Sequence, residues 1–239
     1  MTGSEPLLAA LIVMVAATVQ ATVGFGLALI SVPLLTLVNP DLVPAPLMIC
    51  AVALSVLIGR REVSDTDWRA VGLFISGRVP GAVLAGFILT IVARERLAVV
   101  FALAVIVAVA LSASGIKARP TVLNFLAAGS FSGLMSTITG IGGPPIALVL
   151  QDENPSRLRS TLAWYFASGS IVSLTVLARV GRLGGQELRF AAVMLPGALV
   201  GFLLSRFTRP LAEHPGVVRG GVWAISVAAS ITILVRELL

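Results

Sequence analysis

Long apolar stretches separated by short polar segments run through the whole chain. They lie at 6–38, 43–59, 70–93, 97–115, 122–150, 161–180, 190–205 and 220–235. A helix that crosses a bilayer needs roughly 20 apolar residues, within a range of about 17–25. Several stretches reach this length, and the two 16-residue stretches at 190–205 and 220–235 are at its lower limit. The pattern predicts an all-α polytopic membrane protein.

Two of these stretches contain sequences that interrupt a helix. The segment 122–150 includes Gly140-Ile141-Gly142-Gly143-Pro144-Pro145, and the segment 6–38 includes Val23-Gly24-Phe25-Gly26. As one helix, the 33 residues of 6–38 would be roughly 50 Å long at 1.5 Å per residue. That is too long for a bilayer core of about 30 Å and too short for two full crossings. Each segment is therefore predicted to form two half-length helices hinged at glycine.

The interruptions belong to an internal repeat. ATVGFGLALI at 21–30 matches TITGIGGPPI at 137–146, which lies 116 positions later, and VPGAVLAGF at 79–87 matches LPGALVGF at 195–202 at the same spacing, with a one-residue gap. Two motifs that share one spacing predict two homologous halves, 1–119 and 120–239, each with four apolar blocks. If each hinge turns the chain back, the halves are inverted repeats. This topology also collects more of the loop Arg and Lys residues on one side than a straight-through topology does.

Composition supports a membrane protein and argues against several other classes. The chain is 57% hydrophobic and 12% charged, whereas soluble domains contain about 25% charged residues. The net charge of +6 does not indicate a nucleic-acid partner, because the basic residues lie between apolar blocks and form no continuous stripe. The first apolar run follows Glu5 without a preceding Lys or Arg, so it is predicted to be a retained membrane segment rather than a signal peptide.

Few residues could support a metal site, a cofactor or catalysis. The single cysteine, Cys50, excludes an intrachain disulfide, and the single histidine, His214, lies in a polar loop. No acidic residue falls inside an apolar block, and no nucleotide-binding motif is present. We therefore expect no metal, no cofactor and no enzyme activity.

The hinges are the predicted substrate site. Unwound backbone survives at membrane depth only if it is buried in protein or faces a polar cavity. A helix that begins after such a break aims unpaired N–H groups and its positive dipole end into the membrane interior, where an anion can bind. Small residues that only allow close helix packing are the alternative explanation. The predicted substrate-binding residues at the two breaks are Gln20, Thr22, Gly24, Phe25, Gly26, Ser136, Thr139, Gly140, Gly142, Gly143 and Pro144.

Two arginines complete the predicted site. Arg78 lies within 70–93 with at least eight mostly apolar residues on each side, and its repeat equivalent is Met194. An ionisable group at this depth is costly, so we expect it to face a cavity or a partner; a shifted span, with Arg78 reaching an interface, stays open. Arg159, just before the block 161–180, is the second candidate, whereas its neighbour Arg157 fits an interfacial anchor better.

The motifs VGFGLALISVPLL and TGIGGPPIALVL, in equivalent places of two four-block halves, resemble the TauE/SafE family of sulfite exporters and sulfonate permeases. The resemblance covers essentially the whole chain. It implies a multi-pass carrier in the bacterial inner (plasma) membrane that moves sulfite, related sulfur oxyanions or organosulfonates. The first half departs from the longer glycine run that is frequent in the family.

A secondary transporter for small anions, working by alternating access, is thus the predicted function. The expected partners are a small anionic solute and the lipid bilayer, with homo-oligomerisation left open. An anion channel or an amino-acid exporter would use the same site. An intramembrane lipid phosphatase is less favoured, because every acidic residue lies in a loop or near an end of the chain.

Overall fold

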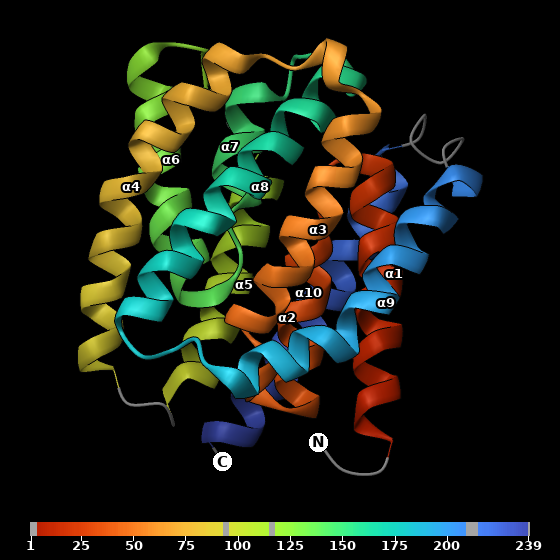
Figure 1. Cartoon of the computed structure of the whole chain (residues 1–239), viewed down its shortest axis with the longest axis vertical. Coiled ribbons are helices and arrows are strands. Elements are labelled where there is room, and N and C mark those ends of the chain that lie inside the picture. The colour runs from red at the N-terminus through yellow and green to blue at the C-terminus, as the bar shows by residue number, and fades with distance from the viewer. Residues whose placement is uncertain (1–3, 93–95, 115–117, 209–214, 239) are drawn as a thin grey trace.

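The computed structural model describes residues 4–92, 96–114, 118–208 and 215–238, and the side chains of the last helix over 220–236. These residues form helices and short connections, with no strand among them (Figure 1). The helices are α1 (Glu5–Val23), α2 (Leu27–Val38), η1 (Pro40–Leu42), α3 (Ala45–Arg61), η2 (Val63–Asp65), α4 (Trp68–Ile91), α5 (Leu97–Ala113), α6 (Val122–Thr139), α7 (Gly143–Leu150), α8 (Pro155–Arg179), α9 (Gly185–Thr208) and α10 (Pro215–Leu238).

The helices confirm the prediction of an all-α polytopic membrane protein. Six of them are long and apolar enough to cross a bilayer: α1, the continuous η1–α3 segment, α4, α6, α8 and α9. The block 190–205 is the core of α9, which is 24 residues long because the helix continues into polar residues at both ends. Large apolar side chains such as Val83, Phe87 and Leu203 are exposed on the outside of the bundle. An apolar outer surface of this extent suits contact with lipid.

Each long first block of a half is divided between two helices. α1 ends at Gly24, whose backbone has φ 105°, and α2 begins after Gly26, whose φ is 136°. α6 ends at Gly140 with φ 88°, and α7 begins at Gly143. Glycine adopts positive φ without the steric cost that a Cβ imposes, so it ends a helix and redirects the chain at little cost.

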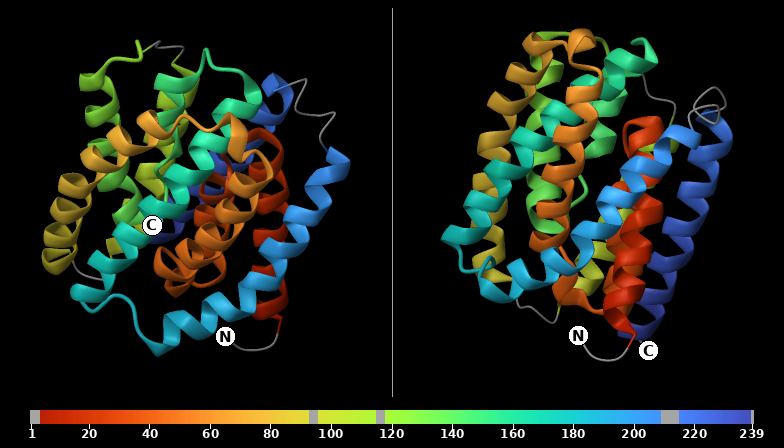
Figure 2. Two further views of the ribbon diagram at one scale, coloured as in Figure 1. Left: turned by 45° about the horizontal axis from the view of Figure 1, so that its top comes forward. Right: turned by 45° about the vertical axis from the view of Figure 1, so that its right-hand side comes forward.

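Helices from the first half pack against helices from the second half. α4 lies along α6 and α1 lies along α9, while α3 packs against α8 near the middle of the bundle (Figures 1 and 2). Glycines bring the backbones close together. A Cβ at Gly81 would lie 1.9 Å from the Ser130 carbonyl oxygen of α6, and one at Gly197 would lie 2.2 Å from the Ala10 carbonyl oxygen of α1. Small residues at such contacts are typical of membrane helices.

Substituting Gly81 by alanine will destabilise the protein, because α4 and α6 must separate to admit the methyl group. We expect a cost of about 1–3 kcal/mol, the usual range for overpacking. The matched control is Gly72→Ala in the same helix, where a Cβ meets nothing within 4 Å. Thermal unfolding in detergent should show a lower melting temperature for Gly81→Ala and an unchanged or raised one for Gly72→Ala. Equal melting temperatures would contradict the close packing.

Ion pairs fasten the start of α8 to the connection between α3 and α4. Arg157 binds Asp67 at 2.8 Å, and Arg159 binds Glu62 at 3.0 Å. Burial acts to raise the pKa of Asp67, but hydrogen bonds from the Ala70 N–H and from Arg157 outweigh it, so this pKa lies below its usual value. Asp67 is therefore ionised at neutral pH, where it caps α4 and holds Arg157. The place of Arg157 at this polar end agrees with a role as an anchor.

Candidate functional site

A cavity lies where the two helix breaks come together. The volume within which the centre of a water molecule can move is about 40 Å³. A cavity that holds a single water needs only about 10–15 Å³ of such volume. α3 and α8 complete its walls, and Arg78 enters from α4. Most of the predicted site residues line this cavity, namely Gln20, Phe25, Gly26, Arg78, Ser136, Gly140, Gly142, Gly143 and Pro144.

The other predicted residues lie behind the cavity wall. The Thr22 hydroxyl donates to the Thr18 carbonyl, and the Thr139 hydroxyl accepts the N–H of Ile141 at the second break. Arg159 makes three hydrogen bonds to the Glu62 carboxylate. Its side chain also covers the first break, since a Cβ at Gly24 would lie 3.0 Å from the Arg159 Cγ. Thr22, Gly24, Thr139 and Arg159 thus shape or cover the breaks without lining the cavity.

Arg78 is buried, with 1% of its surface exposed. Its Nη1 donates to the Tyr165 hydroxyl at 2.9 Å, and its Nη2 donates to the hydroxyls of Ser136 at 2.5 Å and Ser173 at 2.9 Å. Within the part of the chain that the structure describes, its Nε has no hydrogen-bond partner. The guanidinium also lies 5.2 Å from the centre of the Tyr165 ring, within the range of a cation–π contact.

These partners of Arg78 are neutral. Within the described parts of the chain, no salt bridge joins Arg78 to a carboxylate, and no acidic residue lines the cavity. A buried charge is normally paired, because an isolated one is expensive at low dielectric. The positive charge beside the cavity thus lacks a protein counter-ion, and an anion in the cavity would provide one.

A chain of hydroxyl groups connects Arg78 to the second break. Tyr165 accepts from Arg78 and donates to Ser132 at 2.7 Å, and Ser132 donates to the Gly142 carbonyl oxygen at 2.5 Å. On the other side of the guanidinium, Ser173 shares a hydrogen bond with Thr137 at 2.7 Å. The guanidinium and the backbone of the break are therefore held in one polar network.

The first turn of α2 lies at the cavity. The Gln20 side-chain oxygen accepts the N–H of Leu27 at 3.1 Å and so satisfies one of the first-turn groups. The next two residues, Ala28 and Leu29, also line the cavity. First-turn N–H groups have no partner within their own helix. Together with the positive end of the helix dipole, they favour an anion there.

The start of α7 provides fewer donors. The sequence suggests a helix that begins at Pro144, but α7 begins one residue earlier, at Gly143. Pro144 and Pro145 then occupy its first turn, and proline has no N–H. The backbone donors at this break are therefore limited to residues such as Gly142 and Gly143. The first turns of the two helices therefore differ, since α2 has N–H groups on Leu27, Ala28 and Leu29, whereas α7 has one on Gly143.

One face of α8 contributes to the site although the sequence did not predict it. Tyr165, Gly169 and Ser173 recur every four residues, and all three lie against Arg78. A Cβ at Gly169 would lie 2.7 Å from the Arg78 Nε, so the glycine makes room for the guanidinium. The available signal was the only tyrosine of the chain, placed in an apolar block with a serine two turns later.

Among the described residues, no group of three or more His, Cys, Asp or Glu side chains could hold a metal ion. His214 lies outside the described residues. Cys50 is buried and free.

The fold and the cavity define a multi-pass membrane protein with a cationic cavity between two broken helices. The chain matches the family described as sulfite exporter TauE/SafE over residues 9–233. It belongs to this family of membrane transporters, which confirms the resemblance seen in the sequence. It is similar to a protein of Cupriavidus necator named probable sulfite/organosulfonate exporter TauE, with 28% identity over 199 residues that cover 78% of this chain and 77% of the relative. No solved structure matches the chain significantly.

Proposed function

We propose that this protein is a secondary transporter that carries small anions, sulfite or related sulfur oxyanions and organosulfonates, through the cavity between its two broken helices. The observation that carries the proposal is Arg78, a buried cation with only neutral partners beside the cavity. The name of the Cupriavidus necator relative supports the class of substrate. We place the protein in the inner membrane of a bacterium on the same grounds.

In this proposal the anion is held by Arg78 on one side and by the backbone of the breaks on the other. Among the described residues the Arg78 Nε has no hydrogen-bond partner, so the protein leaves part of the guanidinium's hydrogen-bonding capacity unused. Ala28 and Leu29 offer their first-turn N–H groups, and Ser136 adds a hydroxyl at the cavity surface. Charge-assisted hydrogen bonds of this kind are stronger than those between neutral groups.

The packing between the halves supports a two-fold relation between them, as inverted repeats would have. α1 packs on α9 of the second half, and its counterpart α6 packs on α4 of the first half. Likewise α3 contacts both α8 and α9, while α8 contacts both α3 and α4. Such reciprocal packing is what a two-fold relation between homologous halves produces. Rocking of the halves about the cavity would then expose it to each side in turn.

Flux through the purified protein in proteoliposomes tests this function. We expect saturable, protein-dependent uptake of sulfite or of a short-chain sulfonate, with each anion inhibiting the other because they share one site. Empty liposomes provide the control. The turnover rate also distinguishes a carrier from a channel, since a channel would pass ions much faster than a protein that must change conformation for each one. Absence of flux for every anion tested would contradict the proposal.

A further inference from the structure

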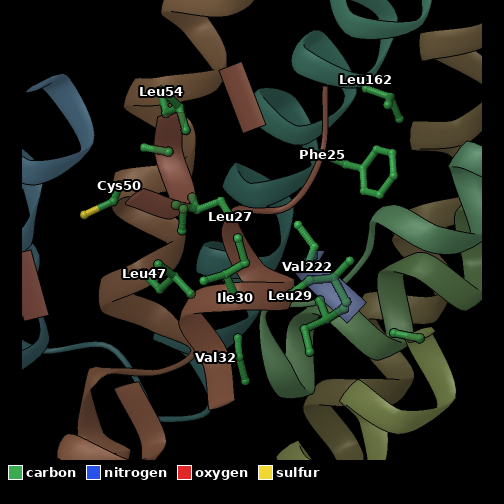
Figure 3. Close-up of a cluster of buried hydrophobic side chains, with 14 of the residues drawn as sticks. Phe25, Leu27, Leu29, Ile30, Val32, Leu47, Cys50, Leu54, Leu162 and Val222 are labelled. Carbon is green, nitrogen blue, oxygen red and sulfur yellow. The ribbon is translucent and has the colours of Figure 1, made fainter. Parts of the chain in front are cut away.

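The cavity has two chemically different walls. Arg78, Ser136 and Gln20 form one side together with the helix breaks, whereas α3 contributes only apolar side chains to the lining, from Leu47, Met48 and Ala51. Leu47 and Met48 are almost fully buried, at 1% and 2% exposure. Figure 3 shows Leu47 on α3 beside Ile30 and Leu27 of α2. Apolar side chains offer no hydrogen bonds, so this wall adds nothing to the binding of a bare inorganic oxyanion.

The charge of the site is also limited. Arg78 is the one charged side chain among the described residues that line the cavity. It can neutralise a single negative charge. A doubly charged anion would keep one charge unpaired in a buried, low-dielectric place, which is strongly unfavourable. The cavity therefore suits a monoanion.

The smallest side chain of the apolar wall is that of Ala51. It carries only a methyl group, whereas its neighbours Leu47 and Met48 carry longer side chains. Two aromatic residues also line the cavity: the Phe166 ring lies 3.5 Å, and the Phe25 Cβ 3.6 Å, from a Cβ built on Gly143. Burial of one methylene in such surroundings strengthens binding by about fourfold.

We propose that Leu47, Met48 and Ala51 form an apolar subsite that receives the aliphatic tail of a singly charged oxyanion whose head group binds Arg78, and that Ala51 sets the length of the tail. This inference rests on the proposed function of the cavity and specifies its substrate class. The preferred solute is an amphiphilic organic monoanion, and inorganic dianions are poor ligands.

Binding of methanesulfonate, ethanesulfonate, propanesulfonate and sulfate to the full chain in detergent tests the proposal. Calorimetry at constant ionic strength should show an affinity that rises by about fourfold for each methylene until the subsite is full. Sulfate should bind at least tenfold more weakly than the best sulfonate. Ala51→Leu should lower the affinity for propanesulfonate by at least tenfold and change that for methanesulfonate by less than threefold. Ala53→Leu is the matched control, since Ala53 is on the same helix, also partly buried and outside the cavity lining. It should leave all affinities unchanged.

The outcomes separate this inference from the function itself. If sulfate binds as well as propanesulfonate, or if Ala51→Leu weakens all sulfonates equally, the apolar subsite is disproved while anion transport stands. If no anion binds and no flux is measured, the proposed function fails as well. Should Ala51→Leu not fold, Ala51→Val takes its place. Valine adds only two methyl groups to the alanine side chain and is smaller than leucine. It should then weaken propanesulfonate binding by at least threefold while methanesulfonate binding stays the same.

Discussion

Replacing Arg78 by methionine will abolish anion transport and leave the protein folded. The substitution installs the residue found at the repeat-equivalent position, Met194, which is itself fully buried. Removing one partner of a buried, hydrogen-bonded charge pair costs about 2–5 kcal/mol. The affinity for the anion should therefore fall by about 30-fold to several thousand-fold. Proteoliposome flux and calorimetric binding measure the loss directly.

The same substitution should preserve or raise the melting temperature. A cation buried among neutral groups destabilises the empty protein, and its removal relieves that cost. Two of the three hydroxyl groups that it leaves have other partners, since Tyr165 bonds to Ser132 and Ser173 bonds to Thr137. The third, that of Ser136, belongs to a residue that lines the cavity. Activity and stability are thus expected to change in opposite directions.

Two further variants show whether the effect of Arg78→Met is specific to this arginine. Arg78→Lys keeps the charge but not the planar fork that reaches several hydroxyls, so it should retain weak binding. Arg189→Met removes an exposed arginine outside the cavity lining and should transport normally. Normal flux in Arg78→Met would remove this residue from the mechanism, and a reduced flux in Arg189→Met would point to a general effect of lost charge.

Substituting Gly140 by alanine will impair anion binding beyond its effect on stability. Gly140 has φ 88°, and a Cβ there would meet no atom closer than 3.5 Å. The cost is therefore backbone strain, about 1–2 kcal/mol for a residue with a side chain. Relaxing that strain moves Ile141 and Gly142, which line the cavity. We expect at least a tenfold loss of affinity for a sulfonate in calorimetry.

Gly181→Ala is the matched control for backbone strain. Gly181 has φ 70° and open space around its Cβ position, but it lies in the connection between α8 and α9, outside the cavity lining. It should lower the melting temperature to a similar degree without changing the anion affinity. If both variants bind anions equally well, the geometry of the second break does not matter for recognition.

Local features of the chain were predictable because they depend on neighbouring residues. Hydropathy along the chain located the apolar blocks that became the long helices. The helices end at Gly24 and Gly140 because glycine alone adopts positive φ cheaply, which is a property of the residue itself. The start of α7 at Gly143 instead of Pro144 is a shift of one residue. Such boundaries depend on hydrogen bonds that the sequence does not specify.

The partners of charged side chains were not predictable in the same way. Arg78 meets Ser136, Tyr165 and Ser173 on helices 58–95 residues further along the chain. Arg159 was a candidate for the site, but its side chain binds Glu62, which lies 97 residues away. The contacts of Arg78 depend on how closely α4 approaches α6 and α8. Gly77 and Gly81 of α4 allow the approach to α6, and Gly169 of α8 leaves room for the guanidinium.

The order of residues was enough to predict that the chain spans a membrane, where its helices are interrupted, and that one arginine lies deep within an apolar block. Hydropathy and the φ preferences of glycine and proline are local properties, so they are encoded at the positions themselves. The folded protein was needed to see that both breaks, Arg78 and the apolar face of α3 surround one cavity. That arrangement arises from the packing of helices from opposite halves, which no local pattern contains.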